Sequence, residues 1–178
     1  NVAVVIKADF KTTAVCLGDT TRFNDLSTYL DGYNITAWSW NFGNNTTSSE
    51  QNPQIVYETA GEYSVTLEIE SNTGCIDKMT KMVTVLPPPS ANISFDSQGC
   101  QNVAISFSGQ SNDNITKWQW NFGDENSSEL NANTAISQNT THIFGEAGIY
   151  EVLLTVTNNI GCTFTATQII EIVENELF

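Results

Sequence analysis

The most informative segment of the sequence is Trp38-Ser39-Trp40-Asn41-Phe42-Gly43, because it returns eighty residues later as Trp118-Gln119-Trp120-Asn121-Phe122-Gly123. Other patterns recur in the same order: Gly61–Val65 returns as Gly148–Val152, and Gly74-Cys75 returns as Gly161-Cys162. The spacing between patterns differs only in polar stretches, where loops absorb extra length at little cost. Self-similarity at this period predicts two copies of one folded unit.

The boundary between the copies falls on Leu86-Pro87-Pro88-Pro89-Ser90. Three consecutive prolines cannot continue a β-ladder and favour an extended, semi-rigid spacer. We therefore expect a first module over residues 1–87, a Pro-rich linker over 88–90 and a second module over 91–178. A loop inside a single domain is the alternative, which the position of the prolines at the repeat boundary disfavours.

A period of two in hydrophobicity marks the strands. Apolar and polar residues alternate along Tyr63–Glu70 and again along Tyr150–Thr157, which indicates strands with one face on a core and the other in water. Further strands are expected over 2–7, 20–26, 78–85, 92–95, 103–108 and 165–173, and no stretch has a convincing helical period. Six or seven short strands per module, separated by Gly, Asn and Pro turns, predict an all-β fold of two β-sandwiches.

The net negative charge of the chain argues against some classes of binding partner. The 178 residues include 20 acidic and 6 basic ones, a net charge of −14. Phosphate backbones and anionic membranes are bound by Lys and Arg clusters, so no nucleic-acid partner is expected. No apolar run is long enough to cross a bilayer, so we expect no membrane insertion in this segment. Because the sequence opens at Asn1 without a Met or an apolar leader, we expect a mature protein or a piece of a longer one.

Four cysteines allow three disulfide pairings. Repeat symmetry favours Cys16 with Cys75 and Cys100 with Cys162, which close loops of similar length inside each module. A Cys₄ zinc site is the competing interpretation, but such sites use closely spaced C-x₂₋₄-C pairs, and the sequence contains none. Reduced, buried cysteines are the third alternative. Disulfides would place the protein in an oxidising compartment.

The recurring motifs resemble those of the PKD (polycystic kidney disease) repeat, whose signature reads roughly W-D-F-G-D-G, N-P-x-H-x-Y and G-x-Y-x-V-x-L. The first copy supplies Trp40–Gly43, Asn52–Tyr57 and Gly61–Leu67, and the second supplies matching segments from Trp120 to Leu154. The resemblance implies a seven-stranded immunoglobulin-like sandwich, found as tandem units in extracellular proteins and not itself enzymatic. The cysteines are similar to those of secreted bacterial surface proteins of this type. The residues that carry the structural motif are Trp40, Asn41, Phe42, Gly43, Tyr63, Trp120, Asn121, Phe122, Gly123 and Tyr150.

Two departures from the family pattern concern the turn after the Trp segment. Asn41 and Asn121 replace the first Asp of the signature, and an Asn side chain can still accept the backbone hydrogen bonds of the turn. Asn45 tolerates a left-handed backbone, whereas Glu125 does so poorly, so we expect a wider or shifted turn in the second module.

Few residues are candidates for chemistry. His142, the only histidine, falls on the family's His position, and Ile55 at the matching site of the first copy favours packing over catalysis. Asp124, Glu125 and Glu129 follow the second Trp segment closely, and oxygen-rich loops suit Ca²⁺, so these three are candidate calcium ligands. A solvated acidic face is the alternative. No other cofactor and no catalytic residue is predicted.

The tryptophans have two interpretations. Trp38 and Trp40 share one strand face, as do Trp118 and Trp120, so all four can belong to the cores. Aromatic faces also suit sugar rings, which makes Trp38 and Trp118 candidates for a sugar-stacking platform.

The function expected from these observations is a non-enzymatic stalk, spacer or adhesive unit of a larger secreted or surface-anchored bacterial protein, with gliding-motility proteins among the candidates. Its expected partners are neighbouring repeats of the same protein and an extracellular glycan or protein ligand. The alternative is an accessory carbohydrate- or protein-binding module of a secreted hydrolase.

Overall fold

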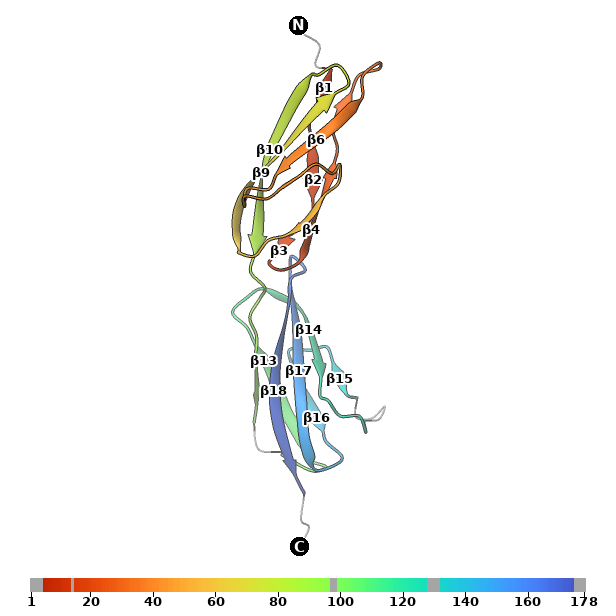
Figure 1. The fold of residues 1–178 in the computed structure, drawn as a ribbon. Helices are drawn as coiled ribbons and strands as arrows, with labels where there is room; N and C mark the ends of the chain where they lie inside the picture. Colours follow the sequence, from red (N-terminus) through yellow and green to blue (C-terminus); the bar gives the residue numbers. More distant parts are fainter. Residues whose placement is uncertain (1–4, 14, 97–98, 128–131, 175–178) are drawn as a thin grey trace. The chain divides into compact units, whose positions relative to one another are not determined.

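The computed structural model describes residues 5–13, 15–96, 99–127 and 132–174. The chain divides into two compact parts, Asn1–Pro87 and Pro88–Phe178, called unit 1 and unit 2 below. Within the described residues every regular element is a β-strand, and none forms a helix that could cross a membrane. The predicted all-β class of two sandwiches is therefore confirmed (Figure 1).

Unit 1 consists of two layers of strands around one core. A five-stranded sheet in the order β3-β10-β9-β6-β7 forms one layer, and a three-stranded sheet in the order β2-β4-β8 forms the other, with a short β1-β5 pair beside them. The strands of unit 1 are β1 (Ile6–Lys7), β2 (Phe10–Thr12), β3 (Val15–Cys16), β4 (Thr20–Asp25), β5 (Thr28–Tyr29), β6 (Ile35–Asn41), β7 (Thr47–Ser48), β8 (Gln54–Val56), β9 (Gly61–Ser71) and β10 (Ile76–Leu86).

Unit 2 repeats this arrangement. Its five-stranded sheet has the order β12-β18-β17-β14-β15, and its three-stranded sheet has the order β11-β13-β16. The strands of unit 2 are β11 (Asn92–Phe95), β12 (Gly99–Cys100), β13 (Ala104–Gln110), β14 (Ile115–Asn121), β15 (Thr134–Ala135), β16 (Asn139–Ile143), β17 (Gly148–Asn158) and β18 (Thr163–Val173).

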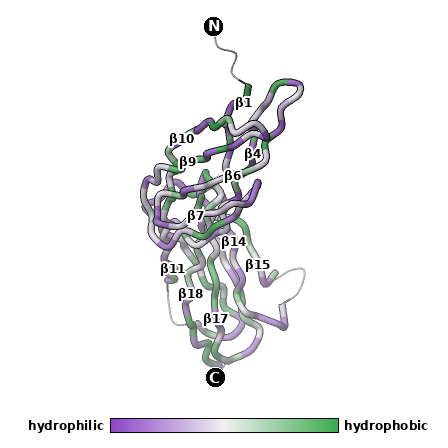
Figure 2. The backbone as a smooth tube through the Cα atoms, turned by 45° about the horizontal axis from the view of Figure 1, so that its top comes forward, coloured by the Kyte–Doolittle hydropathy of each residue, from purple (hydrophilic) through white to green (hydrophobic). Residues whose placement is uncertain are grey.

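The long strands form because their apolar residues alternate with polar ones, so that one face of each strand meets a core. Val65, Leu67 and Ile69 of β9 are fully buried, while their neighbours on the strand are not. The colours in Figure 2 change repeatedly between hydrophobic and hydrophilic along β9, β10, β17 and β18 for the same reason. Strands occur in all the ranges expected from the sequence. Of the expected range 2–7, residues 2–4 lie outside the described residues, and β1 occupies Ile6–Lys7.

Aromatic rings fill both cores. In unit 1, Trp40 and Phe42 lie nearly parallel with ring centroids 6.1 Å apart, and Phe23 contacts both. In unit 2, Trp120 and Phe122 repeat the arrangement with centroids 6.0 Å apart. Rings that touch in this way add stabilisation beyond the apolar area that they bury.

A short parallel pairing closes each five-stranded sheet. Cys16 of β3 lies opposite Leu86, the last residue of β10, and Cys100 of β12 lies opposite Val173, the last residue of β18. The two pairings are equivalent under the repeat. Each therefore places a cysteine at the end of its unit where the last strand ends.

This placement overturns the disulfide pairing expected from repeat symmetry. Cys75 and Cys100 carry free thiols, whereas Cys16 and Cys162 are disulfide-bonded. Because each expected bridge needs one of the free cysteines, Cys16–Cys75 and Cys100–Cys162 are both wrong.

The physical reason is the length of the last strand of each unit. Cys75 directly precedes β10, while Cys16 lies beside its final residue. Cys162 and Cys100 are separated in the same way by β18. An eleven-residue strand spans about 33 Å, and a disulfide requires Cα atoms within about 7 Å. Neither bridge can form while the sandwich is intact.

Gly109 offers a test of how tightly the core of unit 2 is packed. A Cβ on this strand residue would lie 2.5 Å from the Trp118 ring and 3.0 Å from Leu154. We expect Gly109→Ala to lower the free energy of unfolding of unit 2 by about 1–3 kcal/mol through overpacking. Urea denaturation followed by tryptophan fluorescence measures this change.

Gly145 is the matched control, since a Cβ there would meet nothing within 4 Å. Gly145→Ala should change the free energy of unfolding by less than about 0.5 kcal/mol. Equal effects of the two substitutions would show that Trp118 does not pack tightly over Gly109.

Candidate functional site

The repeated Trp segment builds a turn rather than a reactive site. The side-chain Oδ1 of Asn41 accepts a hydrogen bond from the Gly43 N–H at 2.9 Å, and Asn121 does the same for Gly123. Both glycines have a positive φ, and Asn45 adopts a left-handed φ of 66° as its residue type predicts. Asparagine thus performs the structural role that the family signature gives to aspartate.

The tryptophans are held by the sandwich and are not presented as a flat platform. Trp40 and Trp120 are 0% and 2% exposed, and their indole N–H groups donate to backbone carbonyls of Glu50 and Ser137. Trp38 is half-buried and donates to the Asp25 carboxylate at 2.7 Å. Trp118 is also half-buried and packs against the core of unit 2.

A buried ionisable pair distinguishes unit 2 from unit 1. The His142 Nε2 and the Asp124 Oδ2 are 3.1 Å apart, and both side chains are almost completely buried. The imidazole lies parallel to the Phe122 ring at 4.2 Å and edge-on to Phe144 at 4.6 Å. In the first copy, Asn44 and Ile55 occupy the equivalent positions, so this polar pair exists only in the second sandwich.

Burial controls the protonation of this pair. It lowers the pKa of His142 below the ordinary value of 6.5, and the hydrogen bond and charge of Asp124, together with the Ala132 backbone, oppose the shift only in part. The neutral imidazole therefore donates its Nε2–H to the carboxylate. The flat contact with Phe122 and the equivalent Ile55 agree with a packing role for His142.

The three residues expected to bind calcium lie in different surroundings. Asp124 is buried, and its oxygens accept hydrogen bonds from His142 and from the Asn126 N–H. Glu125 is exposed, and Glu129 lies outside the described residues. In the part of the chain that the structure describes, no three His, Cys, Asp or Glu side chains gather as metal ligands. Calcium binding at this turn stays a prediction.

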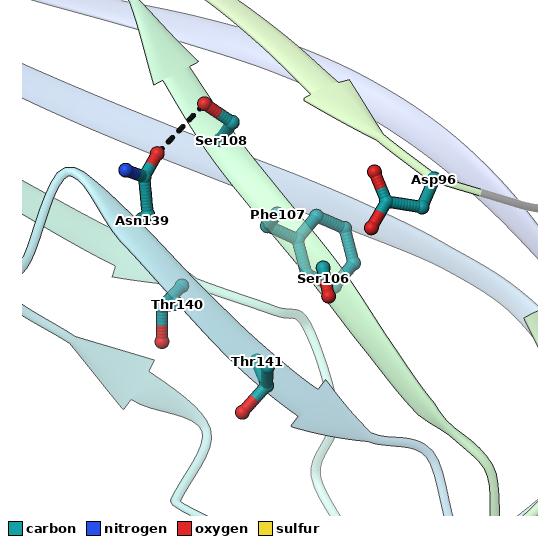
Figure 3. A pocket seen from close by; sticks show the side chains of 7 residues that line it. All are labelled: Asp96, Ser106, Phe107, Ser108, Asn139, Thr140 and Thr141. Carbon is teal, nitrogen blue, oxygen red and sulfur yellow. Dashed lines mark hydrogen bonds between the residues drawn. The ribbon is translucent and has the colours of Figure 1, made fainter.

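A polar depression on the three-stranded sheet of unit 2 is the feature best suited to contact a ligand. Figure 3 shows Ser106 and Ser108 of β13 beside Asn139 and Thr141 of β16, with Asp96 near the end of β11. The Ser108 hydroxyl donates to Asn139 Oδ1 at 2.7 Å. The depression thus offers hydroxyl, amide and carboxylate groups, which form hydrogen bonds with sugars and with peptide backbones.

This depression was not predicted from the sequence. Its members lie on strands that pair across more than thirty residues, with Ser106 opposite Thr141 and Ser108 opposite Asn139. The only local signal is the alternation of serine with buried residues along β13, which is typical of any half-exposed strand.

Comparison with known proteins identifies the repeat. A family profile described as PKD domain matches residues 1–85 and 86–173. The pre-pro-metalloprotease PrtV of Vibrio cholerae is 29% identical over 170 residues, which cover 94% of this chain and 17% of PrtV. The collagenase ColA of Bacillus cereus is 32% identical over 77 residues, which cover 43% of this chain and 8% of ColA. The chain therefore spans less than a fifth of the length of either relative.

Two solved structures are similar to this chain. The crystal structure of the PKD1 domain from V. cholerae PrtV is 33% identical, covers 46% of this chain and 98% of that domain, and has a TM-score of 0.43. A Ca²⁺-stabilized adhesin of an Antarctic bacterium, described as helping it reach out and bind ice, covers 97% of this chain and 50% of its own chain at 10% identity, with a TM-score of 0.54. At that identity the likeness shows the fold alone.

The buried pair predicts a pH dependence of stability. Because folding lowers the pKa of His142, the unfolded chain binds more protons between the lowered value and the ordinary 6.5. This contribution is fully present above pH 6.5 and is lost as the pH falls through the lowered pKa. Urea unfolding of unit 2 between about pH 5 and about pH 8 measures it.

The control variant copies the residues of unit 1 into unit 2. Asp124→Asn combined with His142→Ile reproduces the Asn44 and Ile55 positions and removes the titrating imidazole. The fall in stability below pH 6.5 should then be smaller than in the unmodified chain. An unchanged pH profile would assign the dependence to other groups.

Proposed function

Because the chain belongs to the PKD domain family, we propose that its two units are non-enzymatic spacer modules of a larger protein that acts outside the cell. The observation that carries this proposal is the path of the backbone through each unit, which runs from one end of the sandwich to the other. A module of this kind extends a protein without adding chemistry of its own.

In unit 1 the chain enters and leaves at opposite ends. The Ala8 N–H, early in the unit, donates to Asp77 at 2.7 Å, and Asp77 lies at the start of β10. The chain leaves at Leu86, the last residue of the same strand. Unit 1 therefore advances the backbone by about 30 Å, the length of that strand segment.

Unit 2 has the same design. Ser90 is bonded through its N–H to Asp113 at 2.7 Å, and the nearby Ile115 lies opposite Asn158, next to the turn that precedes β18. The chain reaches Val173 at the other end of β18. Each unit taken by itself thus has its entry and its exit at opposite ends of its last strand.

The parallel pairing at the end of each unit suits a load-bearing role. Pulling on the two ends of unit 1 draws β3 and β10 in opposite directions along their axes, because the strands are parallel and lie near opposite ends of the module's sequence. Their hydrogen bonds are then loaded together in shear. The Leu17 N–H extends this contact by donating to the Leu86 carbonyl at 2.8 Å, and Gln101 does the same to Val173 in unit 2.

The acidic surface supports an extracellular, repetitive setting. A net charge of −14 keeps modules soluble and discourages association between copies of like charge. The proteolytic activities named for PrtV and ColA belong to those much longer proteins. We propose for this chain a role beside such an active domain or within a surface-anchored array.

Single-molecule force measurement tests the spacer role. Leu17→Pro removes the N–H that bonds Leu86, so unit 1 should unfold at a lower force than in the unmodified chain. The measurement is made in reductant so that disulfides carry no load, and unit 2 in the same molecule serves as the internal reference.

Leu17→Ala is the matched control, since it shortens the side chain but keeps the N–H. If both variants unfold at the same force, the pairing of β3 with β10 does not bear the load, and the spacer proposal loses its mechanical basis.

The polar depression of unit 2 favours a second function, that of a recognition module. Its groups would hold a carbohydrate or an extended peptide by hydrogen bonds, because the one aromatic residue that lines it, Phe107, is buried. Pull-down on insoluble polysaccharides and a glycan array would show saturable binding that persists at high salt.

We expect Asp96→Ala combined with Thr141→Val to abolish the binding of the chain to the polysaccharide. Thr167→Val is the matched control, because it makes a similar substitution at an exposed position of β18, on the other sheet. This variant should still bind the polysaccharide. Retention that survives the double substitution would place recognition elsewhere, and absence of all retention would leave the spacer role alone.

A further inference from the structure

The two free thiols lie at different ends of their units: Cys75 at the end where the chain enters unit 1, and Cys100 at the end where the chain leaves unit 2. Cys75 is exposed in the turn before β10, where its N–H donates to Ser71 Oγ at 3.1 Å, and this is the end at which the chain enters unit 1. Cys100 is half-buried in β12 opposite Val173, at the end where the chain leaves unit 2. A bridge within the unit is excluded for both by the length of the last strand.

The equivalent cysteines show that both positions support a disulfide. Cys162 occupies in unit 2 the position that Cys75 has in unit 1: its N–H bonds Asn158, as that of Cys75 bonds Ser71. Cys16 lies opposite the last residue of β10, as Cys100 lies opposite that of β18. Cys162 and Cys16 are both disulfide-bonded. Each free thiol is therefore a copy of a position that is oxidised elsewhere in the same chain.

We propose that Cys100 forms a disulfide with the Cys75 position of a following copy of this repeat. When a further copy follows, the end at which unit 2 releases the chain is joined to the end at which that copy receives it. Cys100 and the Cys75 position of the following copy therefore belong to the two module ends that are joined. The bond would link the two copies covalently outside the peptide backbone.

The chemistry is thiol–disulfide exchange. The two thiols lose two protons and two electrons as one S–S bond forms, and a small-molecule disulfide such as oxidised glutathione accepts them and is reduced to two thiols. The inference rests on the proposed extracellular role only for its oxidising compartment. Because the experiment supplies the oxidant, it tests the cysteine pairing apart from the spacer role.

The test mixes two variants of the full chain. Cys75→Ser leaves Cys100 as its free thiol, and Cys100→Ser leaves Cys75. Equal amounts of the two variants are incubated with oxidised glutathione and should form a disulfide-linked heterodimer. Random pairing would make half of all dimers heterodimers, and we expect a larger fraction. Non-reducing electrophoresis of a size-tagged pair measures the shares, and mass mapping of a digest should identify a Cys100–Cys75 peptide.

Each variant alone is the matched control and should stay largely monomeric, while the unmodified chain should form longer disulfide-linked multimers that dithiothreitol dissolves. Circular dichroism confirms that both variants keep the all-β fold. The proposal is overturned if the mixture stays monomeric, or if either variant dimerises with itself as readily as with the other.

Discussion

A hairpin of two eleven-residue strands forms the backbone of each unit and sets the arrangement of its other elements. β9 pairs with β10, and β17 with β18, in unbroken antiparallel register over ten residue pairs. The inner faces of these strands supply much of the core, and their outer faces meet water. Because the hairpin runs the length of the sandwich, it separates the two ends of each unit and decides where the chain enters and leaves.

The two copies keep one aromatic core and change the polar chemistry beside it. Trp40 and Phe42 lie at an interplanar angle of 8°, the same value as Trp120 and Phe122. Next to this stack, Ile55 in one unit is replaced by His142 bonded to a buried carboxylate in the other. A buried ionisable pair contributes little net stability compared with apolar packing of the same volume, so either solution is compatible with the fold.

The function proposed for the chain follows from where its surfaces and ends lie. Within each sandwich, the tryptophans pack in or against the core, and the indole N–H groups of Trp38, Trp40 and Trp120 donate hydrogen bonds, so the tryptophans do not form an exposed platform. Two surface features offer polar groups for contact: the depression on the three-stranded sheet of unit 2 and the thiols at the module ends. Both suit contact with other molecules or modules better than catalysis, because neither brings a nucleophile and a base together.

The repeat, the all-β class, the main strands and the burial of Trp40 and Trp120 could all be predicted from the sequence. These follow from a period of two and from turn residues, which are local properties of the chain. The sequence also predicted that the Asn45 position would accept a left-handed backbone. Which cysteines can meet and which polar residues share a surface depends on the tertiary structure. Repeat symmetry favoured a bridge between Cys16 and Cys75, but the two are held a full strand apart. Ser106 meets Thr141 only through the pairing of distant strands. Contacts of this kind depend on register and on the length of strands, and spacing along the chain does not encode them.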